Sequence, residues 1–149
     1  MRALIQRVSS GKVEIKGRVV ASIGKGYVIL LGVKEGDSEK EAKLLAEKTV
    51  NLRVMSDENE KMNLSIREVN GAILVVSQFT LYADTTAGRR PSFINAAKTD
   101  EAKRLYEYFI AKLKSSGIKN IQTGEFGAYM TVEIVNDGPV TIMLDTEEL

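Results

Sequence analysis

The sequence contains no cysteine and no histidine, and only two of its 149 residues are proline. Without cysteine, the chain can form no disulfide and offers no thiolate nucleophile. Without histidine, a Ser-His-Asp triad, a Cys-His pair and the usual nitrogen and sulfur zinc sites are excluded. Any hydrolysis must therefore use a hydroxyl, a carboxylate, a lysine, backbone dipoles or groups of the substrate itself. No motif calls for a metal or a cofactor, and we expect none.

Long apolar runs and a strong charge of one sign are also missing. The longest apolar run, Tyr27 to Val33, is too short to span a membrane. Arg2 and Arg7 stand where a signal peptide would need its apolar segment, so we expect a cytoplasmic protein without a membrane partner. The formal net charge is only +1, whereas a dedicated nucleic-acid binder usually carries a basic excess. We expect no DNA partner, and any RNA contact must be small or locally concentrated.

The composition is that of a folded globular protein, with 44% hydrophobic and 28% charged residues. A length of 149 residues suits one domain with a real core. No repeat, linker or low-complexity segment interrupts the chain, so we predict a single domain over residues 1–149.

The stretch Ala72 to Leu81, AILVVSQFTL, gives the strongest strand signal. Its five leading apolar residues follow Asn70-Gly71, a pattern typical of a strand buried on both faces. The polar residues Ser77, Gln78 and Thr80 at its far end have two interpretations. Their side chains either satisfy nearby backbone groups or line a pocket.

Strands outnumber helices in the rest of the chain. Alternation and apolar runs predict further strands at Arg2–Ser9, Val13–Ile15, Val19–Ile23, Tyr27–Val33, Tyr129–Val135 and Val140–Leu144. Ser38, with Glu41 three residues later, predicts a capping box and a helix whose buried stripe is Ala42, Leu45, Ala46 and Thr49. A second helix is predicted from about Thr99 to Ser116, with its buried stripe at Ala102, Leu105, Tyr106, Phe109 and Leu113.

The segment Asn136 to Thr141, NDGPVT, is a turn cluster between two apolar runs. Gly138 tolerates any φ, and Pro139 has a fixed φ and the only kind of peptide bond with an appreciable cis fraction. An ordinary hairpin turn and a specialised element both remain open on composition.

Four segments together carry a family resemblance: RALIQRVSS (Arg2–Ser10), SQFTLYAD (Ser77–Asp84), GRRPSF (Gly88–Phe93) and NDGPVT (Asn136–Thr141). The chain resembles the D-aminoacyl-tRNA deacylases of the D-Tyr-tRNA deacylase type, in order and over essentially its whole length. Two helices cannot cover all of these strands in one sheet, so stacked sheets are more economical. The resemblance implies the same α/β class: a three-layer β/β/α domain with two stacked, mostly antiparallel or mixed sheets, both helices on one face, and a homodimer.

The resemblance also implies an activity and its residues. The family hydrolyses the ester between a D-amino acid and the terminal ribose of tRNA. Carried onto this chain, its catalytic pocket is Ser77, Gln78, Phe79 and Thr80, completed in trans by a Gly-cisPro element, Gly138-Pro139, of the other subunit. The carbonyls of that element capture the α-amino group and leave an L side chain no room. The terminal adenosine is expected near Phe126, Met130 and Ala102.

Two catalytic routes are compatible with the missing histidine. An aminoacyl ester is already activated, so backbone N–H groups at Phe79 and Thr80 can suffice to stabilise the oxyanion while a water is positioned. Thr80 could instead be a covalent nucleophile, but no general base accompanies it. We favour the route in which the ribose 2′-hydroxyl assists the attacking water. Because exclusion of a side chain cannot reject glycine, we also expect cleavage of glycyl-tRNA, including tRNA(Ala) mischarged with glycine.

Three features leave alternatives open. Arg89 and Arg90 in a Gly/Pro-flanked loop are candidate tRNA phosphate contacts or a solvated pair. Phe126 is a stacking platform for a base or part of the core. The chain could therefore be a non-catalytic tRNA-binding or interaction module that uses these residues. A general esterase that uses Ser77 is a third interpretation, and it also lacks a base.

Overall fold

The computed structural model describes all 149 residues. Its elements, in chain order, are β1 (Arg2–Ile15), β2 (Arg18–Ile23), β3 (Gly26–Gly32), α1 (Glu39–Asn51), β4 (Met55–Ser56), β5 (Met62–Leu64), β6 (Ala72–Ser77), the 3₁₀-helix η1 (Phe79–Tyr82), α2 (Thr99–Ser115), β7 (Ile121–Thr123) and β8 (Thr131–Asp145). Neither α-helix has the length and apolar composition that crossing a bilayer requires.

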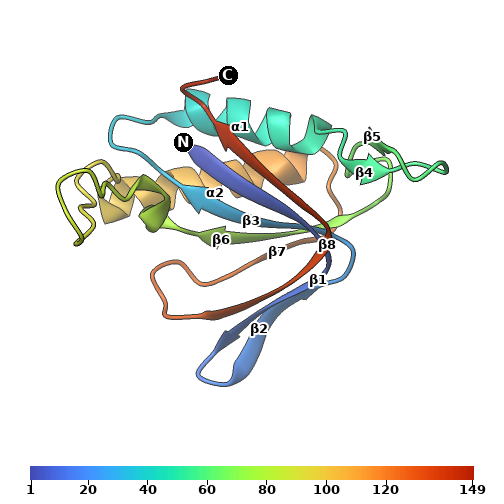
Figure 1. Ribbon diagram of the computed structural model, residues 1–149, viewed down its shortest axis with the longest axis horizontal. Helices are drawn as coiled ribbons and strands as arrows, with labels where there is room; N and C mark the ends of the chain where they lie inside the picture. The colour runs from blue at the N-terminus through green and yellow to red at the C-terminus, as the bar shows by residue number, and fades with distance from the viewer.

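The elements form three layers (Figure 1). Helices α1 and α2 cover one face of a central layer in which β3, β6 and β7 run parallel and the first half of β1 runs antiparallel to β3. The second half of β1, with β2 and the first half of β8, forms the layer on the opposite face. The predicted β/β/α architecture is confirmed. The β4–β5 hairpin is a separate two-stranded sheet.

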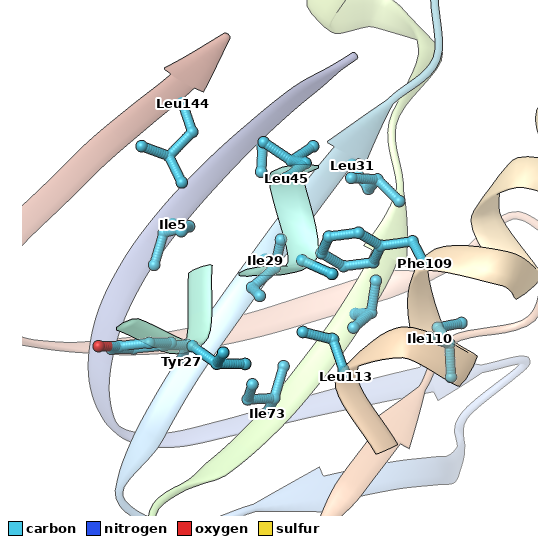
Figure 2. Packing of buried hydrophobic residues seen from close by; sticks show 14 of the residues in the cluster. Ile5, Tyr27, Ile29, Leu31, Leu45, Ile73, Phe109, Ile110, Leu113 and Leu144 are labelled. Carbon is cyan, nitrogen blue, oxygen red and sulfur yellow. The ribbon is translucent and has the colours of Figure 1, made fainter. Parts of the chain in front are cut away.

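The central strands are buried on both faces, as predicted from their apolar runs. In β3, Tyr27, Ile29 and Leu31 pack in the helix-side cluster of 22 buried residues. Val28, between them, belongs to the strand-side cluster of 8 buried residues. Figure 2 shows Phe109 of α2 reaching toward the β3 side chains on the helix side. Strand β3 thus contributes side chains to both clusters, because successive side chains of a strand point to opposite faces.

Strand β1 is longer than predicted. The sequence predicted separate strands at Arg2–Ser9 and Val13–Ile15, but β1 runs without interruption from Arg2 to Ile15. The polar stretch Ser9-Ser10-Gly11 marks a change of partner: Val8 is the last residue paired with β3, and Gly11 the first paired with β2. A Cβ on Gly11 would lie 2.6 Å from Val28 Cγ2, so the two layers approach closely there because this residue is glycine.

Both helices follow the sequence pattern. Ser38 caps α1 as predicted: its Oγ accepts from the Lys40 N–H at 3.2 Å, while Glu41 Oε2 accepts from the Ser38 N–H at 2.8 Å. All four predicted stripe residues of α1 are buried. In α2 the stripe is buried at Leu105, Tyr106, Phe109 and Leu113, whereas Ala102 is half-buried.

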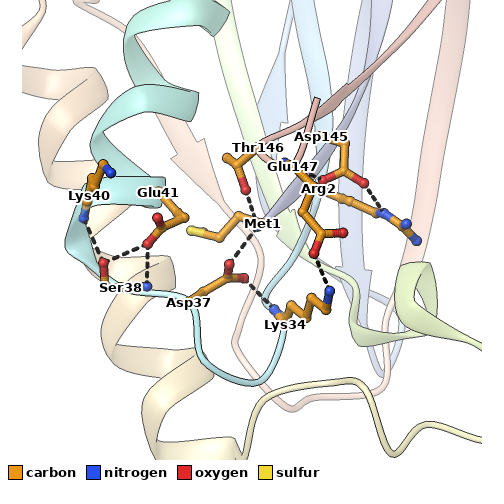
Figure 3. A network of polar contacts seen from close by, with 10 residues as sticks. All are labelled: Met1, Arg2, Lys34, Asp37, Ser38, Lys40, Glu41, Asp145, Thr146 and Glu147. Carbon is orange, nitrogen blue, oxygen red and sulfur yellow. Dashed lines mark hydrogen bonds and ion pairs between the residues drawn. The ribbon is translucent and has the colours of Figure 1, made fainter. Parts of the chain in front are cut away.

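A polar network joins the two ends of the chain beside α1 (Figure 3). The Met1 ammonium donates to Asp37 Oδ1 at 2.9 Å and to Thr146 Oγ1 at 2.6 Å. Arg2 Nε donates to Asp145 Oδ2 at 2.6 Å. We call the set Met1, Arg2, Asp37, Asp145 and Thr146 the terminal network. Every ionic group in it has a partner of opposite charge, as buried charges require.

Candidate active site

Strand β6 ends at Ser77, four residues earlier than predicted, and the chain turns into η1. The Gln78 N–H still donates to the Leu31 carbonyl at 2.8 Å, and Leu81 N–H then turns back to the Gln78 carbonyl at 3.3 Å. Gly32 makes room for this turn, since a Cβ there would lie 3.1 Å from Leu81 Cβ and 3.2 Å from the Gln78 oxygen. The polar end of the predicted strand is therefore a tight turn over the end of β3.

A pocket of about 540 Å³ opens beside this turn. Ser77, Gln78 and Phe79 line it together with Ala102, Phe126 and Met130. These two groups come from different parts of the chain, and the structure brings them into one cavity. The volume falls within the roughly 300–1,000 Å³ range of small-molecule sites. We call this cavity the candidate pocket.

Thr80 lies on the same turn but does not line the candidate pocket. Its side chain is exposed, and its Oγ1 accepts a hydrogen bond from Gln78 Nε2. The N–H groups of Phe79 and Thr80 have no carbonyl acceptor, because the first amides of a helical turn have no intrahelical partner. The turn thus presents two free donors and a hydroxyl that is itself hydrogen-bonded by an amide.

The lining of the candidate pocket carries no lysine, arginine, aspartate or glutamate. Of its 16 residues, 12 are hydrophobic, and the polar groups are hydroxyls, one amide and the backbone. No group of three carboxylates elsewhere is arranged to hold a metal ion. The arrangement can therefore orient a substrate and donate hydrogen bonds to an oxyanion, but its lining supplies no carboxylate, lysine or arginine for acid–base chemistry.

Phe126 stands on a loop that forms one wall of the candidate pocket. The Gly124 N–H donates to the Val75 carbonyl at 3.0 Å, which fixes the loop to β6. A Cβ on Gly124 would lie 2.8 Å from Met130 Sδ, so glycine permits this close packing. The Phe126 ring lies 5.6 Å from the Tyr106 ring. Phe126 therefore packs on the core and is half-exposed. Base stacking on its ring stays a prediction.

The Tyr106 phenol anchors the floor beneath that loop. Its hydroxyl donates to the Val75 carbonyl at 3.0 Å. Burial raises the pKa of Tyr106 to about 12, since a buried phenolate would lose its hydration. The residue is thus a neutral structural donor rather than an acid for catalysis near neutral pH.

The Gly138-Pro139 element is not a hairpin turn, so that interpretation of the sequence is wrong. Both flanks of β8 pair with the same strand: Asn136 pairs with Val8 and Thr141 with Gln6. The segment Asp137–Val140 is therefore an insertion within one strand, opposite a single residue of β1. The Gly138–Pro139 peptide bond is cis. Both residues are exposed, and neither lines the candidate pocket of its own chain.

Arg7 is the residue opposite this insertion, and it is 8% exposed. Its Nε donates to the Asp137 carbonyl at 3.1 Å, and its Nη1 donates to the Val54 carbonyl at 2.7 Å. A Cβ on Gly138, whose φ is +127°, would lie 3.1 Å from Arg7 Nη2. A buried guanidinium thus links the insertion to Val54, the residue that precedes β4.

Arg89 and Arg90 lie outside the candidate pocket, on an exposed loop closed by the Asp84–Ser92 bridge. Asp84 accepts from the backbone and the hydroxyl of Thr86 at 2.9 and 2.7 Å. These hydrogen bonds lower the pKa of Asp84. Neither arginine forms a salt bridge, so both guanidinium groups are free to contact a partner.

Sequence reasoning gave no role to three residues that the structure places at the site. Phe93 lines the candidate pocket, with its ring 5.0 Å from Phe79 in an edge-on contact. Tyr129 also lines it and is 96% exposed. Arg7 supports the insertion. Phe93 and Arg7 lie inside the segments that carry the resemblance, and this position could have indicated a role at the site. Nothing in the sequence distinguishes Tyr129.

Known proteins resemble this chain over its whole length. A profile of the family described as D-Tyr-tRNA(Tyr) deacylase matches residues 4–145. The D-aminoacyl-tRNA deacylase of Thermosipho africanus is 52% identical over 100% of this chain and 99% of the relative. The D-aminoacyl-tRNA deacylase of Clostridium botulinum is 54% identical over 99% of each.

Two solved structures share the fold. The structure titled c-Myc DNA Unwinding Element Binding Protein superposes with a TM-score of 0.93 at 40% identity, covering 97% of this chain and 98% of the other. A probable eukaryotic D-amino acid tRNA deacylase superposes with a TM-score of 0.78 at 17% identity, covering 96% and 97%, and this likeness supports the fold alone. With its profile matched over residues 4–145 and full-length relatives at 52% identity, the chain belongs to the D-Tyr-tRNA(Tyr) deacylase family.

Proposed function

We propose that this chain hydrolyses the ester of D-aminoacyl-tRNA, giving free D-amino acid and intact tRNA. The observation that carries the proposal is the candidate pocket, where Ser77, Gln78 and Phe79 of the turn line the same cavity as Phe126, Met130 and Ala102. The two free amides of this turn belong to Phe79 and to the adjacent Thr80. The turn suits an ester, and the other three residues suit an adenosine. Family membership and the names of the relatives support the same activity. Such an enzyme would work in the cytoplasm, where aminoacyl-tRNA is used.

The uncharged lining favours substrate-assisted hydrolysis. Because no carboxylate, lysine or arginine lines the pocket, the ribose 2′-hydroxyl is the group that orients the attacking water. The amides of Phe79 and Thr80 stabilise the oxyanion. A nucleophilic Thr80 is disfavoured because its Oγ1 accepts from Gln78 and has no base to remove its proton. Ser77 has no base either, which argues against a general esterase.

The handedness filter of this proposal is Gly138-Pro139 from a second copy of the chain. Neither residue lines the pocket of its own protomer, yet both are exposed. They project from β8, whose outer edge has no partner strand and whose Val135 and Met143 are 43% and 48% exposed. A free strand edge with apolar side chains favours pairing with another chain. In the homodimer, main-chain carbonyls of the element capture the α-amino group and exclude an L side chain.

The proposal extends to glycine and to the body of the tRNA. Glycine has no side chain to exclude, so glycyl-tRNA, including mischarged tRNA(Ala), is also a substrate. Arg89 and Arg90 contact tRNA phosphates from their exposed loop. Duplex DNA is no partner in this proposal, because a net charge of +1 provides no extended basic surface.

The activity is tested by incubating catalytic amounts of the protein with D-tyrosyl-tRNA and with L-tyrosyl-tRNA. We expect many turnovers of the D ester and little loss of the L ester. Stoichiometric binding without ester cleavage would instead establish a non-catalytic tRNA-binding module. Equal cleavage of both esters would remove the chiral filter from the proposal.

A mixing experiment tests the contribution in trans. One variant, Gly138→Ala with Pro139→Ala, keeps its pocket but alters the filter, and a second, Ala97→Trp, fills its pocket but keeps the filter. Each alone lacks D-selective turnover. Mixed dimers contain one complete site, so mixing should restore D-selective activity. No recovery from a mixture that demonstrably exchanges subunits would place the filter in the same chain as the pocket.

A further inference from the structure

A second groove lies on the other side of the Phe126 loop, between α2 and β7. It has a volume of about 560 Å³ and is bordered by Lys103, Glu107, Lys114, Glu125 and Phe126. Phe126 borders both this groove and the candidate pocket. The two cavities are therefore neighbours that share one aromatic residue. We call the second cavity the α2 groove.

The polarity of an RNA strand gives the α2 groove a position relative to the substrate. The amino acid is attached to the 3′ end, so the ester lies at the Ser77–Thr80 turn and the adenosine lies toward Phe126. The preceding nucleotide leaves through the 5′ phosphate of the adenosine, on the side away from the ester. The α2 groove shares Phe126 with the candidate pocket and is bordered by no residue of the Ser77–Thr80 turn, so it lies on the adenosine side of the pocket.

The side chains of the α2 groove suit a pyrimidine nucleotide. Lys103 Nζ lies 4.0 Å from Glu107 Oε1. Lys114 forms no such ion pair, so its ammonium is available to a phosphate. Glu125 forms no salt bridge, and a carboxylate accepts from the exocyclic amine of cytosine. Phe126 supplies an aromatic surface, and bases stack on such rings without regard to sequence. The candidate pocket has no ionic group in its lining, whereas the α2 groove, which shares Phe126 with it, is bordered by two lysines and two glutamates.

We propose that the α2 groove binds the nucleotide that precedes the terminal adenosine, a cytidine in tRNA. Lys114 contacts the phosphate that links this cytidine to the adenosine, Glu125 accepts from the cytosine amine, and Phe126 lies between the two bases. This inference rests on the proposed deacylase function and deepens it. It also explains how the enzyme would achieve a higher kcat/KM on the end of a tRNA than on an isolated aminoacyl-adenosine.

The test compares two small substrates, D-tyrosyl-adenosine and D-tyrosyl-cytidylyl-adenosine, which differ only in the preceding nucleotide. For the unaltered protein we expect kcat/KM to be about tenfold higher on the dinucleotide, the size of one stacked base or one phosphate contact. In Lys114→Glu this advantage should fall to about onefold, while turnover of D-tyrosyl-adenosine stays unchanged, since Lys114 lies outside the candidate pocket.

Lys112→Glu is the matched control. Both lysines stand in the last turn of α2, so their exchange for glutamate changes the helix dipole and the net charge equally. Lys112 Nζ lies 4.9 Å from the centre of the Tyr108 ring and does not border the groove. Lys112→Glu should keep the dinucleotide advantage.

Three outcomes would overturn the α2 groove proposal: equal kcat/KM on both substrates for the unaltered protein, an equal loss on both in Lys114→Glu, or loss of the advantage in Lys112→Glu as well. Failure of the proposed function looks different, because then the folded, unaltered protein would cleave neither small substrate nor D-tyrosyl-tRNA.

Discussion

Charge is distributed in opposite ways in the terminal network and in the candidate pocket. In the terminal network, Met1, Arg2, Asp37 and Asp145 are drawn into ion pairs at 2.6 and 2.9 Å. The candidate pocket has no ionic side chain in its lining. Ionic groups therefore hold the chain ends together. The proposed reaction in the pocket would instead rely on backbone donors and on groups of the substrate.

The two regions meet at one residue, Arg2. Its Nε pairs with Asp145, while its Nη1 donates to the Leu81 carbonyl of η1 at 2.9 Å. Its guanidinium also lies 4.6 Å from the centre of the Tyr82 ring. Arg2 of the terminal network thus contacts the turn that carries Phe79 and Thr80 through Leu81 and Tyr82, although no ionic side chain lines the pocket.

The largest effect is expected from the substrate rather than from the protein. D-tyrosyl-tRNA with a 2′-deoxy terminal adenosine should lose about 10²–10⁴ in kcat/KM, the usual contribution of a positioned proton-transfer group. Single-turnover ester cleavage measures this loss. A 2′-deoxy group at the preceding nucleotide is the control and should have a far smaller effect. Retained activity on the deoxy substrate would mean that a protein group supplies the chemistry after all.

Breaking the terminal network should lower stability and leave catalysis intact. Asp37→Asn removes the charge that faces the Met1 ammonium, and a hydrogen bond between charged groups contributes about 1.5–3 kcal/mol. For a chain of this size each kcal/mol shifts the Tm by about 2–4 °C. Denaturant unfolding and kcat/KM are measured on the same preparation. A fall in kcat/KM at a temperature where the variant is folded would contradict the separation of the two regions.

The stability contributed by Asp145 should depend on pH. Burial opposes ionisation of this carboxyl, but hydrogen bonds from Arg2 and from the Glu147 N–H outweigh it and lower the pKa. A lowered folded-state pKa stabilises the protein above the unfolded value of about 3.9, and that stability is lost as the pH falls through the folded-state pKa.

The measurement is the free energy of unfolding of the parent protein and of Asp145→Asn as a function of pH. The difference between them should be largest and constant above about pH 5 and should shrink below about pH 4. Glu133→Gln, at an exposed carboxylate of β8, is the control and should show a much smaller difference. A difference for Asp145→Asn that grows as the pH falls would contradict a lowered pKa of Asp145 in the folded protein.

The smallest effect is expected at Thr80. Thr80→Ala keeps the backbone amide and removes only the hydroxyl, so kcat/KM should change by about twofold or less. A covalent nucleophile would instead cost several orders of magnitude. Thr80→Ser is the matched variant, because it keeps the hydroxyl. A large loss in Thr80→Ala that Thr80→Ser restores would reinstate the covalent route.

The sequence predicted most elements because their signals are local. The capping residues Ser38 and Glu41 and the buried stripe of α1 lie within a few turns of one another, and all behave as expected. The buried run of β6 is likewise predicted by its own residues. The predicted end of that strand, Leu81, is wrong. The turn at Gln78 depends on the space left by Gly32, which lies 46 positions earlier in the chain.

The sequence alone determined that no imidazole or thiol takes part, that two amphipathic helices cover buried strands, and which family the motifs resemble. Only the tertiary structure decided that the Ser77–Phe79 turn shares a cavity with Phe126 and Met130, and that Asp137–Val140 is an insertion facing Arg7. The physical reason is range. Periodicity and capping act over a few residues, whereas strand pairing and close packing join segments whose separation leaves no local trace.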